Sequence, residues 1–571
     1  MAYRKKFFFV LLVNLFLCLT GIFFSSLEVY IGNMGEFTFP FRHVWWIILS
    51  LSVLVSVFLS CLESFLPEKA VLTLCSLAIA VGICFYLQSM FMNSQLQELT
   101  GENVCFGAAT VKKNLVLWGS VIAVVLLGSW MIQRFAGAAR LKEVFLLISA
   151  GLIIIQAAGL FSTAASVTET EKNKDLYLST EKEFTLSAEK NVLYFILDTC
   201  DMEYVDAALA IDPDLFREFT GFVSYQNATS MYSRTYPSLP YLMTGEKCYF
   251  DIPYSEYLKR AYVNSSFLPD LDASGADIRL YTALSYLDSG AYQFVDNLQS
   301  YDSGSLDRVS VTKLLRAMLR LSGYREMPYL LKPYFSYTID PINRNVLADP
   351  PEDYYTLTNN DFEFYERLRS NRVSADESIP SAFRLYHLFG PHPGCYMNAY
   401  AGYDPNASQV DAFRGDIYIL NEYLRQLKDN GIYEQTTIIV TADHGNQNEN
   451  EDLVLKSAPC CIMLLKRAGA DSADPMVFSE APVSHEDLFA TVLDGFDRDI
   501  SSYSPPLYRH EVNEERSRTY YYTAQRSWGD GEVALKEYTI SGDARELSNW
   551  KLTGKVWDIR YSMNAVSKNK E

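Results

Sequence analysis

Two acidic residues and a histidine follow apolar runs of the sequence, where their side chains could bind one cation. Residues 191–197 are apolar apart from Asn191 and end at Asp198, and the run Thr437–Thr441 is followed by Ala442, Asp443 and His444. Short apolar or β-branched runs predict buried strands. Open α/β sheets bind ligands just past the carboxyl ends of their strands. Adjacent Asp and His residues there can give one oxygen and one nitrogen to the same ion.

A hydroxyl and two imidazoles are the other candidates for chemistry. Thr235 stands two residues before Pro237, a spacing that suits the first turn of a helix. The dipole and free N–H groups there favour a bound anion and a developing alkoxide, and a nearby metal would lower the pKa of the hydroxyl further. Arg234 either neutralises a phosphate or is a surface residue. His387 ends a third apolar run, Phe383–Leu388, and His392 follows it.

Each of these residues also has a plain structural interpretation. An Asp at a strand end is often a cap or turn residue, a Thr before a Pro is usually a helix cap, and loop histidines are commonly on the surface. Their coincidence favours function, because the chain has only six histidines and three of them follow apolar runs in this way. We therefore predict Asp198, Asp443 and His444 as metal ligands, with Thr235 as fourth ligand and nucleophile.

The elements that would position these residues alternate along the chain. Between the third run and the run ending at Thr441, residues 410–428 have apolar positions spaced by four and three, which predicts a helix. Strand, helix and strand in this order predict an α/β domain with a mostly parallel sheet flanked by helices. The Tyr-rich segments of residues 519–559 predict a small C-terminal antiparallel sheet. Further strands are expected at Phe222–Tyr225 and Cys461–Leu465.

The N-terminal part reads as a transmembrane helical bundle. Five apolar stretches approach or reach the ~20 residues that cross a bilayer; they are Phe7–Phe24, Val44–Leu62, Val71–Leu87, Asn114–Gln133 and Val144–Phe161. Most flanking basic residues place the N-terminus inside, although Lys112 and Lys113 oppose this. We therefore expect a multi-pass plasma (cell) membrane protein. Its parts would be a transmembrane domain (1–165), a linker (166–190) and an extracytoplasmic catalytic domain (191–571), with a C-terminal β subdomain from about 515 to 571.

Charge and cysteine content narrow the function classes. Residues 1–166 hold ten basic and seven acidic residues, a net charge of +3. The formal net charge of the whole chain is −19, so the remaining residues carry −22. This argues against a nucleic-acid partner. The ten cysteines show no metal-binding spacing. Cys105, Cys200, Cys248 and Cys395 would face an oxidising space, where disulfides among them are undetermined.

The order of the motifs resembles the sulfatase and alkaline phosphatase superfamily over about residues 190–500. It runs strand–Asp198, Thr235-x-Pro-Ser-x-x-x-Leu-x-Thr-Gly, His387-x-x-Gly-x-His392-Pro, strand–Asp443-His-Gly. Val483–Leu493 resembles a late, mostly structural segment of the superfamily. Several spans before an outward domain are similar to lipoteichoic acid synthases and phosphoethanolamine transferases. The resemblance implies one divalent ion (Mn²⁺, Mg²⁺ or Zn²⁺), bound by Asp198, Thr235, Asp443 and His444.

The same resemblance implies roles for other residues. Thr235 matches the sulfatase nucleophile, His392 and His387 would bind substrate phosphate or help protonate the leaving group, and Lys456 lies where sulfatases often place a substrate-contacting lysine. Asp198-Thr199 stands where sulfatases carry a pair of acidic residues. Membrane transferases generally have Glu at the position of Asp198. Threonine cannot become formylglycine, and Leu239 replaces the arginine of the sulfatase motif. The last two departures argue against sulfate ester hydrolysis and for phospho-group transfer.

These observations predict a metal-dependent phospho-group transferase. A membrane phospholipid would donate its head group to Thr235, and a surface glycan or lipid would accept it. Phosphoglycerol is favoured over phosphoethanolamine as the transferred group. A phosphodiesterase or sulfatase-like hydrolase remains open, as does a non-catalytic envelope-assembly protein. A transporter is disfavoured, because no span carries a buried charge pair.

Overall fold

The computed structural model describes most of the chain, which forms two compact units. The described residues are 2–32, 37, 39, 41–93, 106–166, 176–252, 254–300, 309–335, 342–358, 360–446, 455–471, 473–525 and 533–558. The first unit comprises mainly Met1–Lys174 and Asp302–Pro350. The second unit comprises Asp175–Tyr301, Pro351–Arg526 and Gly531–Glu571. The sequence did not indicate that residues 302–350 belong with the N-terminal part.

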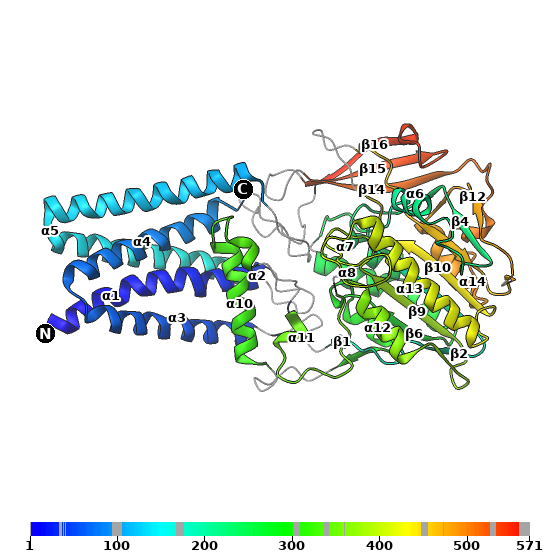
Figure 1. Cartoon of the computed structure of the whole chain (residues 1–571), viewed down its shortest axis with the longest axis horizontal. Coiled ribbons are helices and arrows are strands. Elements are labelled where there is room, and N and C mark those ends of the chain that lie inside the picture. The colour runs from blue at the N-terminus through cyan, green and yellow to red at the C-terminus, as the bar shows by residue number, and fades with distance from the viewer. Residues whose placement is uncertain are drawn as a thin grey trace. The chain divides into compact units, whose positions relative to one another are not determined.

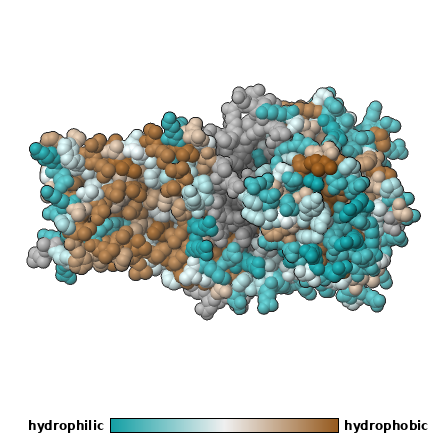
Figure 2. All heavy atoms as spheres, viewed as in Figure 1, coloured by the Kyte–Doolittle hydropathy of each residue, from teal (hydrophilic) through white to brown (hydrophobic). Residues whose placement is uncertain are grey.

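The first unit is built on long apolar helices. α1 (Ala2–Cys18) continues through a π-helical turn (Leu19–Phe24) into α2 (Ser25–Gly32), and is followed by α3 (Phe41–Ser64), α4 (Glu68–Phe91) and α5 (Ala108–Ser166). Within the described residues, four helical stretches are long and apolar enough to cross a membrane. Figure 2 shows their surface as a nearly continuous apolar zone. The chain thus has the make-up of a membrane protein.

Helix α5 contains two of the five expected spans. Gly137 interrupts it with φ 88° and ψ 164°, angles that no helix contains, and Figure 1 draws α5 as two segments that run alongside each other. An unbroken helix of 59 residues would be about 90 Å long, roughly three times the thickness of a bilayer core. The glycine supplies a left-handed conformation that other residues rarely adopt. The stretches Asn114–Gln133 and Val144–Phe161 therefore lie on either side of this break.

The second unit has a seven-stranded sheet in the order β12-β4-β11-β10-β3-β9-β6. Only β11 (Met463–Lys466) runs antiparallel to its neighbours. The other strands are β3 (Asn191–Leu197), β4 (Phe222–Tyr225), β6 (Asp277–Tyr281), β9 (Ala382–Leu388), β10 (Thr436–Ala442) and β12 (Val477–Ser479). Every residue of β3, β9 and β10 is buried, as expected for central strands covered on both faces. The predicted mostly parallel α/β fold is confirmed.

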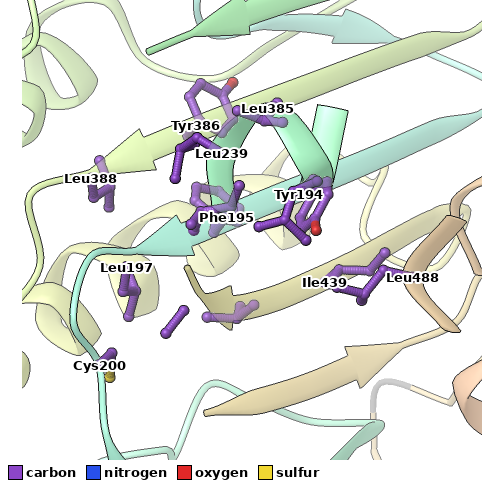
Figure 3. Close-up of a cluster of buried hydrophobic side chains, with 14 of the residues drawn as sticks. Tyr194, Phe195, Leu197, Cys200, Leu239, Leu385, Tyr386, Leu388, Ile439 and Leu488 are labelled. Carbon is purple, nitrogen blue, oxygen red and sulfur yellow. The ribbon is translucent and has the colours of Figure 1, made fainter. Parts of the chain in front are cut away.

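Helices surround this sheet and complete the core. They are α6 (Met202–Ile211), α7 (Thr235–Thr244), α8 (Tyr254–Asn264), α9 (Phe267–Asp272), α12 (Phe362–Asn371), α13 (Gln409–Asp429) and α14 (Leu488–Asp494). Helix α13 matches the predicted helix, and a capping box between Ser408 and Asp411 fixes its start. Figure 3 shows Leu239 of α7 and Leu488 of α14 among side chains of β3, β9 and β10. These contacts hold α7 and α14 on the sheet.

Smaller sheets lie around the main one. Strands β14 (Ser517–Gln525), β15 (Val533–Ser541) and β16 (Trp550–Asp558) form the predicted C-terminal antiparallel sheet. β1 (Leu176–Leu178) pairs with β7 (Leu298–Ser300), and β2 (Thr185–Ser187) pairs with β8 (Ser374–Asp376). β5 (Ala228–Thr229) pairs with β13 (Val483–Ser484). Part of the segment expected as a linker is thus paired with strands of the second unit.

The cysteines expected to face an oxidising space are not paired with one another in the described residues. Cys200, Cys248 and Cys395 are buried free thiols. Cys105 lies outside the described residues. Burial raises the pKa of the Cys200 thiol far above its usual range, so this cysteine is a packing residue and not a reactive thiolate.

Candidate metal centre and nucleophile

Strand register brings the two aspartates together. β3 and β10 are parallel neighbours with Leu197 opposite Ala442, so the next residues of each strand, Asp198 and Asp443, leave the sheet side by side. β9 is the other neighbour of β3, with Leu388 opposite Leu197. The loop carrying His392 therefore starts at the same edge. The side chains predicted at strand ends meet because parallel strands end together.

Asp443 and His444 present unused ligand atoms to one point. Asp443 Oδ1 accepts hydrogen bonds from the backbone N–H groups of Thr199 (2.9 Å) and His444 (2.8 Å). Asp443 Oδ2 is buried and has no hydrogen-bond donor among the described residues. His444 Nδ1 lies 2.8 Å from the carbonyl oxygen of Gly445, so Nδ1 carries the proton and the lone pair of Nε2 is available. Nε2 lies 3.5 Å from Asp443 Oδ2.

The electrostatics of the cluster fit a divalent cation. Asp198, Asp443 and His444 each offer one ligand atom, and these atoms lie within 4.8 Å of one another. Burial raises the pKa of Asp198 well above its usual range, and the neighbouring Asp443 raises it further. His444 and the hydroxyl groups of Thr199 and Thr235 lower it, but burial and Asp443 outweigh them. Two carboxylates and an imidazole suit Mn²⁺, Mg²⁺ or Zn²⁺, and the unpaired Asp443 Oδ2 is an atom that such a cation would satisfy.

Thr235 places its hydroxyl beside this cluster. Its Oγ1 lies 3.4 Å and 3.5 Å from the two carboxylate oxygens of Asp198 and 3.3 Å from His444 Nε2. Thr235 is the first residue of α7, with Arg234 at the N-cap, so the positive end of the helix dipole faces the hydroxyl. Unlike the buried Asp198, Asp443 and His444, Thr235 is partly exposed. A substrate can therefore reach it.

The turn after β3 is shaped around this contact. Thr199 has a left-handed φ of 57°, which costs a β-branched residue conformational energy. The strained conformation lets its N–H reach Asp443 Oδ1 while its hydroxyl donates to Asp198 Oδ1 (2.7 Å). Thr199 thus orients both carboxylates, a role that the sequence did not reveal.

The C-terminal sheet holds the loop before Thr235. Tyr521 of β14 donates its N–H to Met231 O (2.8 Å) and accepts the N–H of Ser233 (3.1 Å). Ser233 Oγ in turn accepts the N–H of Thr523 (2.9 Å). The side chain of Tyr232 is fully buried and stacks on Tyr521, with ring centroids 5.3 Å apart. The candidate nucleophile Thr235 is therefore anchored by residues almost three hundred positions away in sequence.

His485 and Ser238 connect this loop and α7 to β10. The fully buried His485 lies with Nε2 3.0 Å from Ala442 O, and its Nδ1 accepts the N–H of Met231 (3.2 Å). Ser238 Oγ donates to Asp443 O (2.7 Å). Burial lowers the pKa of His485 to about 4, so it is neutral at physiological pH. Both residues fix the distance between Thr235 and the aspartates without contacting a substrate.

The two predicted phosphate-binding histidines occupy different environments. His387 is fully buried in β9; its Nδ1 lies 3.1 Å from Thr282 Oγ1 and its Nε2 lies 3.8 Å from Asp198 Oδ2. Burial lowers its pKa to about 4. His392 lies on the loop after β9, partly exposed, and packs against Phe389 with ring centroids 4.8 Å apart. His387 is next to the cluster, whereas His392 is the one open to solvent.

Asp361 holds the loop that carries His392. Its buried carboxylate accepts the N–H groups of Phe389 (2.9 Å) and Gly390 (2.8 Å). Gly390 has φ 61°, and a Cβ at this position would lie 2.7 Å from backbone atoms of Asp198. The loop thus packs directly on the start of the site. Asp361 was not predicted from the sequence, since no motif surrounds it.

The two predicted basic contacts lie at the margin of the cluster. Arg234 is partly exposed and adjoins Thr235. Lys456 is exposed, next to the buried Leu455, and residues 447–454 before it lie outside the described part of the chain. The roles of both residues stay predictions, as do the ligand roles of Asp198, Thr235, Asp443 and His444.

Comparisons with known proteins give structural similarity only. No protein-family model matches the chain, and no curated protein matches it in sequence. The chain is similar in structure to the phosphonate monoester hydrolase SpPMH of Silicibacter pomeroyi, with 15% identity over 65% of this chain and 89% of that one and a TM-score of 0.36. It is also similar to an alkaline phosphatase superfamily protein from Vibrio parahaemolyticus (13% identity, 68% and 88% covered, TM-score 0.37).

A third similar structure is the sulfatase PsFucS1 of a Pseudoalteromonas species, with 12% identity over 65% of this chain and 84% of that one and a TM-score of 0.33. These proteins, a phosphonate monoester hydrolase, an alkaline phosphatase superfamily protein and a sulfatase, are members of the alkaline phosphatase and sulfatase superfamily. Because the TM-scores lie below 0.5, the function proposed next depends on the motifs and the site geometry of this chain.

Proposed function

We propose that this protein is a membrane-anchored, metal-dependent phospho-group transferase with Thr235 as its nucleophile. One observation carries the proposal. The Thr235 hydroxyl, at the start of α7, lies within 3.5 Å of both Asp198 carboxylate oxygens and of His444 Nε2. A divalent ion held by Asp198, Asp443 and His444 would lower the pKa of this hydroxyl and neutralise charge on a phosphate.

The reaction divides into two displacements at phosphorus. In the first, Thr235 Oγ1 bonds to the phosphorus of a phospholipid and the bond to the diacylglycerol oxygen breaks. Thr235 gives up its hydroxyl proton to solvent, and the leaving oxygen takes a proton, for which the partly exposed His392 is the candidate donor; His392 then regains its proton from solvent. In the second, an acceptor hydroxyl attacks the same phosphorus, the bond to Oγ1 breaks, and Thr235 regains its proton. Water in place of the acceptor would make the enzyme a hydrolase.

Features beside the cluster support the assignment of a phosphate substrate. The N–H groups of Thr235 and Tyr236 in the first turn of α7 can bind anionic oxygens, and the helix dipole favours negative charge there. Arg234 adjoins them. The apolar helices of the first unit would keep the enzyme in the same bilayer as its donor, which raises the effective concentration of head groups. The finer assignment, phosphoglycerol passed to a surface glycan or lipid on the extracytoplasmic side, rests on the sequence resemblance.

Intact mass spectrometry tests this proposal directly. Full-length protein in Mn²⁺ is mixed with vesicles containing phosphatidylglycerol or phosphatidylethanolamine, without acceptor, and the mass added to the Thr235 peptide is read together with released diacylglycerol. We expect a phosphoglycerol adduct, which is lost in Thr235→Ala and kept in Thr235→Ser. A phosphoethanolamine adduct instead would name the other donor.

The remaining outcomes separate the rival functions. Continuous release of a phosphomonoester with no acceptor would identify a hydrolase. If neither lipid modifies the protein or is consumed, and Thr235→Ala still supports growth of a deletion strain, the chain is an envelope-assembly protein and the transferase proposal is wrong.

A further inference from the structure

Residues 309–335 and 342–346 belong to the first unit and pack on the membrane helices. The chain passes from β7 of the second unit into the segment Asp302–Pro350 of the first unit and then returns. Its described elements are α10 (Val311–Glu326), a 3₁₀ turn (Lys332–Phe335) and α11 (Ile342–Val346). We call residues 309–346 the insertion. The chain therefore joins the two units not only after α5 but also at each end of the insertion.

The insertion shares a hydrophobic core with the helix ends of the bundle. Leu314, Met318 and Leu321 lie on one face of α10, at a spacing of four and three, and are at most 4% exposed. They pack with the buried residues Leu27, Tyr30 and Ile31 of α2 and Val44, Ile47 and Ile48 of α3. Ile342 and Val346 of α11 belong to the same cluster.

Polar contacts fix the insertion on several membrane helices at once. Ser322 Oγ donates to Gly21 O (2.6 Å), and Tyr329 N donates to Asn114 Oδ1 (3.1 Å). Asn93 Nδ2 donates to Arg325 O (3.0 Å). These partners lie in or beside different spans, so the insertion fits one arrangement of the bundle and not a generic apolar surface.

Arg325 is the central ionic contact. Its guanidinium pairs with Glu28 of α2 and donates to Ser89 Oγ of α4 (2.7 Å). About a quarter of each member of the Arg325–Glu28 pair is exposed, so the pair is largely shielded from water. Truncating one member leaves the other charge poorly solvated. Arg325 thus sets the register of α10 on the bundle.

We infer that the insertion is a second, noncovalent anchor, whose partner is the end of the chain's own membrane bundle. One cut between Ser166 and Leu176 removes the covalent connection after α5 but leaves the insertion docked. The catalytic unit would then stay with the membrane as a two-fragment complex and would not be released as a soluble enzyme. This inference does not depend on the proposed chemistry.

The test is a specific protease site placed between Ser166 and Leu176 of the full-length protein. Membranes carrying it are cleaved and centrifuged, and the fragment that starts near residue 170 is quantified in pellet and supernatant. We expect the fragment to stay in the pellet. With Met318→Asp and Arg325→Glu together, cleavage should move most of it to the supernatant, an increase of at least about tenfold, since about 1.4 kcal/mol of lost binding gives a factor of ten.

Matched variants control for the changes themselves. Arg316→Glu makes the same charge change on the exposed face of α10 and should leave the fragment in the pellet. Glu28→Arg should partly restore retention in a chain carrying Arg325→Glu alone. Uncleaved Met318→Asp/Arg325→Glu protein should stay in the membrane, and its released fragment should still shift its melting temperature with Mn²⁺ if folded.

Two results would overturn the inference. One is release of the fragment from the unmodified insertion after complete cleavage. The other is equal retention of the Met318→Asp/Arg325→Glu fragment, which would assign membrane binding to another surface of the catalytic unit. Neither result bears on whether Thr235 is a nucleophile.

Discussion

The two units each bury a cluster of charged side chains, and the clusters differ in their balance of positive and negative groups. In the first unit, Glu326 and Lys332 are at most 2% exposed and lie near the Arg325–Glu28 pair. Lys332 Nζ donates to the carbonyl oxygens of Tyr324 (2.6 Å) and Arg325 (2.8 Å). In the second unit, Asp198, Asp443 and His444 gather; burial and Asp443 raise the pKa of Asp198, and His444 lowers it.

The difference separates a structural cluster from a ligand site. The first cluster contains both charge signs, so its members neutralise one another within the protein. The second concentrates carboxylates whose mutual repulsion is relieved only by a proton or a cation. Burial alone therefore does not mark the site, since both clusters are buried. The excess of carboxylates, two beside a single imidazole, marks the second cluster as the candidate metal site.

The largest expected effect comes from removing one of the second cluster's carboxylates. Asp443→Asn deletes a proposed ligand, so transferase activity should fall at least about 10³-fold, and Mn²⁺ should no longer raise the melting temperature. The free energy of unfolding of the unmodified protein should rise by about 2.7 kcal/mol at a metal concentration one hundred times Kd. Without metal, the variant should melt above the unmodified protein, because one buried like charge is gone. The measurement is thermal unfolding with Mn²⁺ and with EDTA.

The exposed Glu511 provides the control for this change. Glu511→Gln should alter neither activity nor the metal response, since its carboxylate is open to solvent. A metal-free Asp443→Asn protein that melts below the unmodified one would contradict the repulsion argument and make Asp443 an ordinary structural residue.

The first cluster should respond in the opposite way. Arg325→Met leaves Glu28 without its partner and should lower the free energy of unfolding by about 2 kcal/mol, below the 3–5 expected of a fully buried pair because a quarter of each side chain is exposed. The double variant Glu28→Gln/Arg325→Met should lose less free energy of unfolding than the two single variants lose in sum. Mn²⁺ should not rescue either variant. A double-mutant cycle by thermal unfolding in detergent measures the coupling, and additive losses would show that the pair does not interact.

A third pair, Asp361 and Asp416, predicts how stability depends on pH. Burial raises the pKa of Asp361 to about 6 and that of Asp416 well above its usual range. The folded protein therefore holds protons that the unfolded chain has already lost above about pH 4, so this pair's contribution to stability falls as pH rises through the folded pKa values. Asp416→Asn keeps a hydrogen-bond donor for Asp361 without a second charge.

We accordingly expect the difference in melting temperature between Asp416→Asn and the unmodified protein to grow in favour of the variant from pH 5 to pH 8. Asp429→Asn, on the exposed end of α13, should show no such trend. Asp361→Asn should instead lower transferase activity, because its amide cannot accept both N–H groups of the His392 loop as the carboxylate does. A pH-independent difference for Asp416→Asn would mean that the two carboxyls titrate normally.

The sequence predicted the parts of the site that strand order controls. Asp198 and Asp443 were identified because apolar runs mark strands, and parallel strands end at one edge. The strained turn at Thr199, the Asp361 bond to the His392 loop and the pairing of Ser233 with β14 depend on contacts between distant segments, which no local pattern encodes. The amphipathic face of α10 likewise does not identify its partner, since the spacing of apolar residues does not show whether a helix packs on a sheet or on membrane helices.

The smallest effect that still distinguishes the clusters is expected at Ser238. Its hydroxyl donates to Asp443 O, so Ser238→Ala should cost about 1 kcal/mol of stability while leaving every proposed ligand and the nucleophile in place. Because the bond ties α7 to β10, its loss should lower kcat several-fold with little change in KM for the lipid. Ser502→Ala, a change at an exposed serine, should change neither quantity. A drop in stability without a drop in kcat would mean that catalysis does not require a fixed distance between Thr235 and the aspartates. The cation, and not the packing of α7, would then hold the proposed nucleophile in position.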